Sequence, residues 1–241
     1  MEREFSTGPI FSKSFDIFGQ NFSFMAILGF MATVPTFLTA LAPQNTTLAV
    51  LVMPITFLIT YLIQGVVVYG VFQHLTGQKV NLGDSFNVAL KRLGYLILVA
   101  MATGFLTMLG LVFLIIPGII ISLMLWVAIP VTMVEKGGVG HALQRSRELT
   151  TGYRLQIFGI TFLAGLIAAL ATGIQYGLIA ASGAMGMVPG SLAANLVSLP
   201  IMVLTTGLAA SLNSVIVTVS YYNLRQDVEG VATEDLASVF E

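Results

Sequence analysis

Charged residues occur in only four short stretches of this chain of 241 residues. The stretches are 1–16, 79–92, 135–154 and 225–241, and the three long intervals between them contain no Asp, Glu, Lys or Arg. These intervals have 62, 42 and 70 residues. Because one helix needs about 20 apolar residues to cross the hydrocarbon of a bilayer, each interval can contain two spans. The pattern predicts a membrane protein whose charged stretches all face the same side.

Composition and charge placement support this class and orient it. The chain is 56% hydrophobic and 9% charged, whereas a typical soluble domain is about 25% charged. All ten Lys and Arg lie on the predicted charged side, so the positive-inside rule predicts that this side and both termini are cytoplasmic. The start, Met1 to Glu4, has no basic region leading into an apolar stretch, so a cleaved signal peptide is not expected.

Turn-forming residues divide each interval into two spans, which predicts an all-α protein with six transmembrane helices in three hairpins. Pro117 and Gly118 form the turn of the second hairpin, whose second span has only about 17 residues, near the lower limit. A re-entrant pair therefore remains an alternative there. The charged stretch 225–241 is an acidic cytoplasmic tail of this single domain. The predicted spans are 22–41, 48–74, 94–116, 118–134, 155–181 and 192–223.

A repeated amphipathic segment precedes each hairpin. Phe11, Phe15, Phe18 and Phe22 recur at helical spacing and form one apolar stripe. Comparable stripes occur in 82–93 and 139–149. The predicted unit is a short interfacial amphipathic helix followed by a transmembrane hairpin, used three times.

Residues 109–154 carry a recognisable signature. It consists of Ile116-Pro117-Gly118, a span that ends at Glu135, and then Ala142-Leu143-x-x-Ser146 followed by Leu149-Thr150-x-Gly152. This pattern resembles the YciC-like bacterial inner-membrane family and the membrane domain attached to some glycerophosphodiester phosphodiesterases. The resemblance implies a six-helix protein of the bacterial inner membrane with cytoplasmic termini. It implies little about activity, because the phosphodiesterase chemistry belongs to a separate soluble domain.

Catalytic and metal-binding motifs are absent from the sequence. No zinc-protease, nucleophile-elbow, phosphate-loop or dinucleotide fingerprint occurs, so neither enzymatic activity nor a cofactor is expected, and no nucleic-acid partner. His74 and His141 lie far apart with no ligand-spaced partner, so a metal site is not expected either. The predicted spans carry no Asp, Glu, Lys or Arg, which argues against proton-coupled or charge-selective transport.

Three sets of residues are candidates for function. Basic residues at the cytoplasmic boundary either bind anionic lipid headgroups or only fix the topology; they are Lys91, Arg92, Arg145, Arg147 and Arg154. Polar residues within the spans either form bonds between helices or line a site for a neutral ligand; they are Gln64, Tyr69, Gln175, Tyr176, Asn195 and Asn213.

The third set is a row of small residues at i+4 spacing that favours close packing of a neighbouring helix, consisting of Gly165, Ala169, Gly173 and Gly177. That neighbour belongs either to the same chain, at the small face around Gly207 and Ala210, or to a second copy.

The most economical function is that of a non-enzymatic lipid-interacting scaffold or accessory protein. Its expected partners are membrane lipids, including anionic phospholipids, and either further copies of itself or a larger membrane complex. The main alternative is a permease or channel for a small neutral or amphiphilic compound.

Overall fold

The computed structural model describes residues 5–41, 45–184, 200–201 and 203–230. In these residues the chain forms α-helices and one π-helical turn, without strands. The elements are α1 (Thr7–Gln20), α2 (Phe22–Leu41), α3 (Thr46–Leu75), α4 (Leu82–Phe113), α5 (Ile115–Met124), α6 (Ala128–Val134), α7 (Val139–Thr150), α8 (Arg154–Ala184), η1 (Val203–Gly207) and α10 (Leu208–Glu229).

Several of these helices are long and apolar enough to cross a membrane. In the described residues there are four such segments: α3, α4, the α5–α6 pair, and α8 over Arg154–Ala181. Helices α1 and α2 would form a fifth if their pair, bent by 87°, were one span. The predicted class, an all-helical membrane protein, is confirmed. The count of six spans is not confirmed, and part of the sixth predicted span lies outside the described residues.

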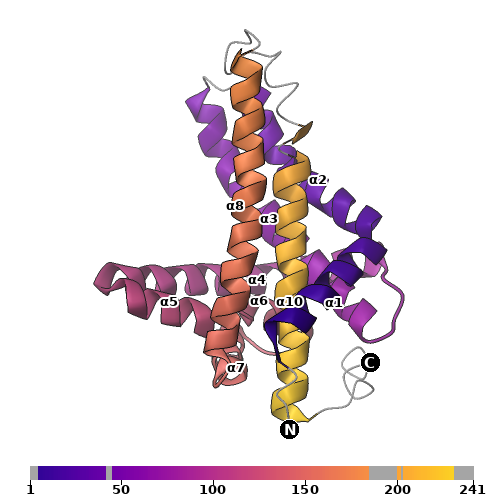
Figure 1. The fold of residues 1–241 in the computed structure, drawn as a ribbon, viewed down its shortest axis with the longest axis vertical. Helices are drawn as coiled ribbons and strands as arrows, with labels where there is room; N and C mark the ends of the chain where they lie inside the picture. The colour runs from indigo at the N-terminus through magenta and orange to yellow at the C-terminus, as the bar shows by residue number, and fades with distance from the viewer. Residues whose placement is uncertain (1–4, 42–44, 185–199, 202, 231–241) are drawn as a thin grey trace.

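The helices follow two directions. In Figure 1, α8 and α10 run along the long axis of the molecule, whereas α4 and α5 extend sideways across that axis. Helices α4 and α5 pack closely against each other as a hairpin. The second predicted hairpin is therefore present, but it does not run parallel to α8 and α10.

The amphipathic segments that begin the repeat differ from one another. The first is the separate helix α1, which ends at Asn21, and the third is α7, which a turn at 151–153 separates from α8. In that turn Gly152 has a φ of +91°, which favours glycine. Residues 82–93 instead continue without a break into α4, because no such turn follows Leu93. The prediction of three separate interfacial helices is wrong at this second position.

The turn of the α4–α5 hairpin also lies earlier than predicted. The break is at Leu114, which has extended backbone angles (φ −162°, ψ 146°). Pro117 lies in the first turn of α5, where its missing N–H leaves no helical hydrogen bond unmade. Gly118 lies inside α5, and a Cβ there would be 2.5 Å from the Leu111 side chain. Gly118 therefore permits close packing of α4 on α5 and is not a turn residue.

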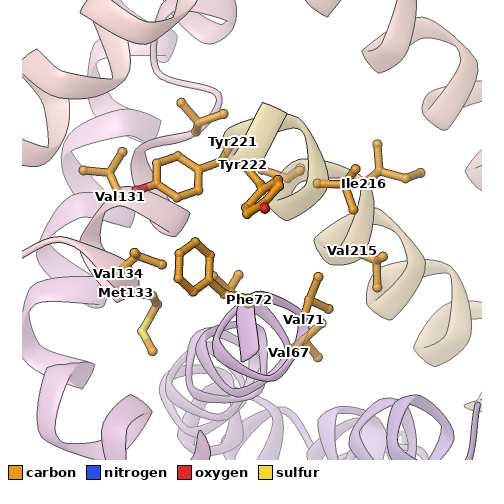
Figure 2. Close-up of a cluster of buried hydrophobic side chains, with 14 of the residues drawn as sticks. Val67, Val71, Phe72, Val131, Met133, Val134, Val215, Ile216, Tyr221 and Tyr222 are labelled. Carbon is orange, nitrogen blue, oxygen red and sulfur yellow. The ribbon is translucent and has the colours of Figure 1, made fainter. Parts of the chain in front are cut away.

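The buried core joins α3, α6 and α10. Figure 2 shows Phe72 of α3 facing Tyr221 and Tyr222 of α10, and the ring centroids are 6.3 and 6.2 Å apart. Val131 and Val134 of α6 close the cluster. This core lies near the charged termini of the helices and positions the polar groups described next.

Candidate functional site

A charged cluster joins α6, α7 and α10 at one end of the molecule. Glu135, which caps the C-terminus of α6, accepts hydrogen bonds from Arg145 Nε (3.3 Å) and from the Tyr221 hydroxyl (2.9 Å). Arg145 also forms an ion pair with Glu229, whose other carboxylate oxygen accepts a 2.8 Å hydrogen bond from Arg225 Nε. We call Glu135, Arg145, Tyr221, Arg225 and Glu229 the charged cluster.

The charged cluster is largely shielded from solvent but borders an open cavity. The side chains of Glu135 and Arg145 are only 12% and 18% exposed. Lys136 and His141 line the adjoining cavity of about 570 Å³, and His141 Nε2 lies 3.8 Å from Glu135. Because each carboxylate in the cluster has a cationic partner, the arrangement stabilises the positions of three helices and leaves no unpaired nucleophile.

Arg92 stabilises the same region through the backbone. Its Nη1 donates to the carbonyl oxygens of Thr132 (2.7 Å) and Glu135 (2.6 Å). These carbonyls are at the end of α6, where helices leave carbonyl groups without helical partners and where a positive charge is favourable. Arg92 thus fixes α6 against α4.

The five predicted headgroup residues therefore divide into three groups. Arg92 is bonded to backbone carbonyls and Arg145 to carboxylates, and their role as lipid ligands stays a prediction. Lys91 and Arg147 are exposed. Arg154 is partly buried, and in the described part of the chain its Nε is buried without a hydrogen-bond partner.

The predicted intramembrane polar residues do not form one site. Gln64 and Asn213 line a small cavity of about 140 Å³ between α3 and α10. Gln175 instead accepts a 3.3 Å hydrogen bond from the Thr206 hydroxyl, which joins α8 to η1. Tyr69 packs against the core and Tyr176 is exposed, whereas Asn195 lies outside the described residues.

The predicted row of small residues on α8 makes no close contact within the described chain. A Cβ built on Gly165, Gly173 or Gly177 would meet nothing within 4 Å. Close packing at these three glycines is therefore not seen among the described residues, and packing of the row against a second copy stays a prediction. Close backbone contact occurs instead between Gly29 of α2 and Gly207 of η1.

The missed features had different signals in the sequence. Glu135 lies within the signature already noted, but its partners Arg145 and Tyr221 come from two further helices, and Tyr221 is 86 residues away. Among the residues that the structure describes, no group of three or more His, Asp or Glu side chains could bind a metal ion.

No family model, curated protein or solved structure matches the chain.

Proposed function

We propose that this chain is a non-enzymatic, multi-pass protein of the bacterial inner membrane, related to the YciC-like family, that acts as a lipid-interacting scaffold or accessory protein. Its termini are cytoplasmic in this proposal. The observation that carries it is the extent of exposed apolar surface on α4, α5 and α8, with Phe113 79% and Leu155 80% exposed. A surface of this kind needs a cover of lipid or of another apolar surface.

Exposed basic residues near this apolar surface supply the headgroup contact. Lys91 is on α4 and Arg147 is on α7. In the described part of the chain neither forms a side-chain ion pair, whereas Arg145 has three carboxylate partners, Glu135, Glu148 and Glu229. Basic residues at a membrane surface attract anionic lipid by about 1 kcal/mol each.

The charged cluster supports the scaffold role over an enzymatic one. Its side chains pair with each other and fix α6, α7 and α10 in one arrangement. A rigid cytoplasmic end of this kind can present Lys91 and Arg147 at constant positions relative to the membrane.

Retention of anionic lipid tests this function. The variant Lys91→Gln with Arg147→Gln should bind phosphatidylglycerol about 30-fold more weakly than wild type, because two contacts of about 1 kcal/mol are lost and 1.4 kcal/mol is tenfold. Native mass spectrometry of the purified protein, titrated with defined lipid, gives this ratio. The charge-preserving pair Lys91→Arg with Arg147→Lys is the control and should bind like wild type. Equal binding by the Gln variant would contradict the proposal.

A permease for small neutral compounds is the second candidate, because two cavities meet on α10. The cavities of about 140 and 420 Å³ share Ala210 and Asn213 among their lining residues. In a permease they would form parts of one path. Proteoliposomes would then swell in glycerol or urea faster than empty liposomes, and Asn213→Leu would slow the swelling. Equal swelling rates for protein-containing and empty liposomes would exclude this candidate for these solutes.

A further inference from the structure

The larger of these two cavities separates α8 from α10. Its volume of about 420 Å³ lies within the range of about 300–1,000 Å³ that small-molecule sites usually have. Gly165 and Ala168 line it from α8, and Ala209 and Asn213 line it from α10. Small residues therefore create a hollow at membrane depth where large side chains would close the gap.

The threonine hydroxyls of the cavity wall are already used within the protein, that of Thr206 in the bond to Gln175 and the other three within their own helices. Thr161 donates to the carbonyl oxygen of Ile157, and Thr172 donates to that of Ala168, both at 2.8 Å. Thr205 donates in the same way to Ile201 at 2.8 Å. These threonines therefore offer methyl groups, and their hydroxyl protons are not available to a ligand. A wall of this kind suits a hydrocarbon chain, because a strongly polar ligand would leave its own hydrogen-bonding groups unpaired.

Arg154 lies on the same face of α8, nearer the charged end. Residues 161, 165, 168 and 172 follow it at separations of 7, 11, 14 and 18, which place all of them on one helical stripe. At 1.5 Å per residue, Arg154 is about 10 Å along the helix from Thr161. Arg154 thus lies between the cavity and the charged end of the molecule. Its distance from the cavity matches the distance between a lipid phosphate and the first part of the acyl chain.

Arg154 also differs from the other arginines in this region. Arg92, Arg145 and Arg225 donate to carbonyl or carboxylate oxygens. In the described residues Arg154 has no ion pair, and its Nε is buried without an acceptor. A phosphate oxygen would supply that acceptor, since guanidinium groups bind phosphate through several parallel N–H donors.

We infer that one anionic phospholipid occupies this site, with its phosphate at Arg154 and one acyl chain between α8 and α10. The inference rests on the proposed lipid interaction and adds a single defined site to the diffuse contacts at Lys91 and Arg147. We call it the α8–α10 lipid site.

Photocrosslinking tests where the acyl chain lies. Phosphatidylglycerol with a diazirine in one acyl chain, reconstituted with the full chain, should label peptides from 161–172 and 205–216. Ala168→Phe fills the cavity and should remove most of this label. Ala169→Phe is the matched control, because Ala169 has the same size, is exposed and lies outside the cavity lining, and it should keep the label. Label that persists in Ala168→Phe would overturn the site.

A lipid titration tests the phosphate contact. Arg154→Gln should weaken binding of the first phosphatidylglycerol about tenfold, and Arg154→Lys should restore part of the affinity. If inorganic phosphate at millimolar concentration displaces the bound lipid, Arg154 binds a free anion and the acyl-chain part of the inference fails. If Ala168→Phe changes the number of subunits while no lipid label is found, a second copy fills the cavity and the inference fails.

The same variants separate this inference from the proposed function. Arg154→Gln and Ala168→Phe should each remove one lipid and leave the weaker binding through Lys91 and Arg147 intact. Loss of lipid binding only in the Lys91 and Arg147 variant would support the general lipid interaction and overturn the α8–α10 lipid site. Thermal unfolding of Ala168→Phe should occur at a temperature no lower than that of wild type, since the substitution fills an open cavity.

Discussion

Gly29 of α2 and Gly207 of η1 contact each other backbone to backbone. A Cβ on Gly29 would be 2.8 Å from the carbonyl carbon of Gly207, and one on Gly207 would be 2.6 Å from the carbonyl oxygen of Gly29. One turn away, the Ser211 hydroxyl donates to the carbonyl oxygen of Met25 at 3.3 Å. The start of the last helix can approach α2 this closely because neither glycine has a side chain.

Substitution at this contact should destabilise the fold. Gly29→Ala places a methyl group against backbone atoms that cannot rotate away, and overpacking of this kind costs about 1–3 kcal/mol. Unfolding in mixed micelles with increasing SDS measures the loss. The control is Gly173→Ala, where nothing lies within 4 Å of the added methyl group; a similar loss in both variants would show that the cost is not specific to this contact.

Arg145 should be needed for stability more than for lipid binding. Arg145→Ala leaves Glu135 and Glu229 facing each other without the cation between them, and loss of a hydrogen-bonded charge of this kind costs about 1.5–3 kcal/mol. Unfolding of Arg145→Ala, Glu229→Ala and the double variant gives the coupling energy of the pair. Arg147→Ala, on the exposed side of the same helix, should change stability little. Additive effects of Arg145→Ala and Glu229→Ala would contradict the ion pair.

Arg92 and Lys91 should respond differently although they are adjacent. Arg92→Ala removes a charged donor from two carbonyls at the end of α6 and should lower the free energy of unfolding by about 1.5–3 kcal/mol. Lys91→Ala removes an exposed side chain and should have an effect within about 0.5 kcal/mol. Both are measured by the same unfolding assay; equal effects would mean that the Arg92 contact does not stabilise the protein.

Cysteine labelling tests how the α4–α5 hairpin lies in the membrane. If α3 and α8 cross the bilayer, a hairpin that extends sideways from α8 should keep its tip within the hydrocarbon. A membrane-impermeant reagent added to intact cells should then label Asn45→Cys but neither Gln78→Cys nor Leu114→Cys. Labelling of Leu114→Cys from outside would instead show that α4 and α5 cross completely, as in six full spans.

The sequence predicts the class and most helices well, because membrane helices depend on local apolar length. Residues 22–41 and 48–74 nearly coincide with α2 and α3. The prediction of a separate interfacial helix at residues 82–93 is wrong. The amphipathic stripe is present there, but these residues form the first part of α4 because no turn follows them. A local pattern also cannot show that two helices cross rather than run side by side.

The site was harder to predict, since its basic residues look alike in the sequence. Arg145 and Arg147 are on the same short helix, yet Arg145 pairs with Glu229 of the last helix whereas Arg147 is exposed. That difference depends on which helix packs behind α7. Likewise, the row of small residues on α8 predicts a close helix contact, but Gly165 borders a cavity and Ala169 is exposed.

The first and last parts of the described chain contact each other. The backbone N–H of Phe5 donates to Asp227, at a sequence separation of 222, and the Phe5 ring packs edge-on against Tyr153. At a synthesis rate of about 5–20 residues per second, the segment that begins at Phe5 is therefore made roughly 10–45 s before the part of α10 that it contacts. The docking of α1 on α10 therefore cannot precede the synthesis of nearly all of the described chain.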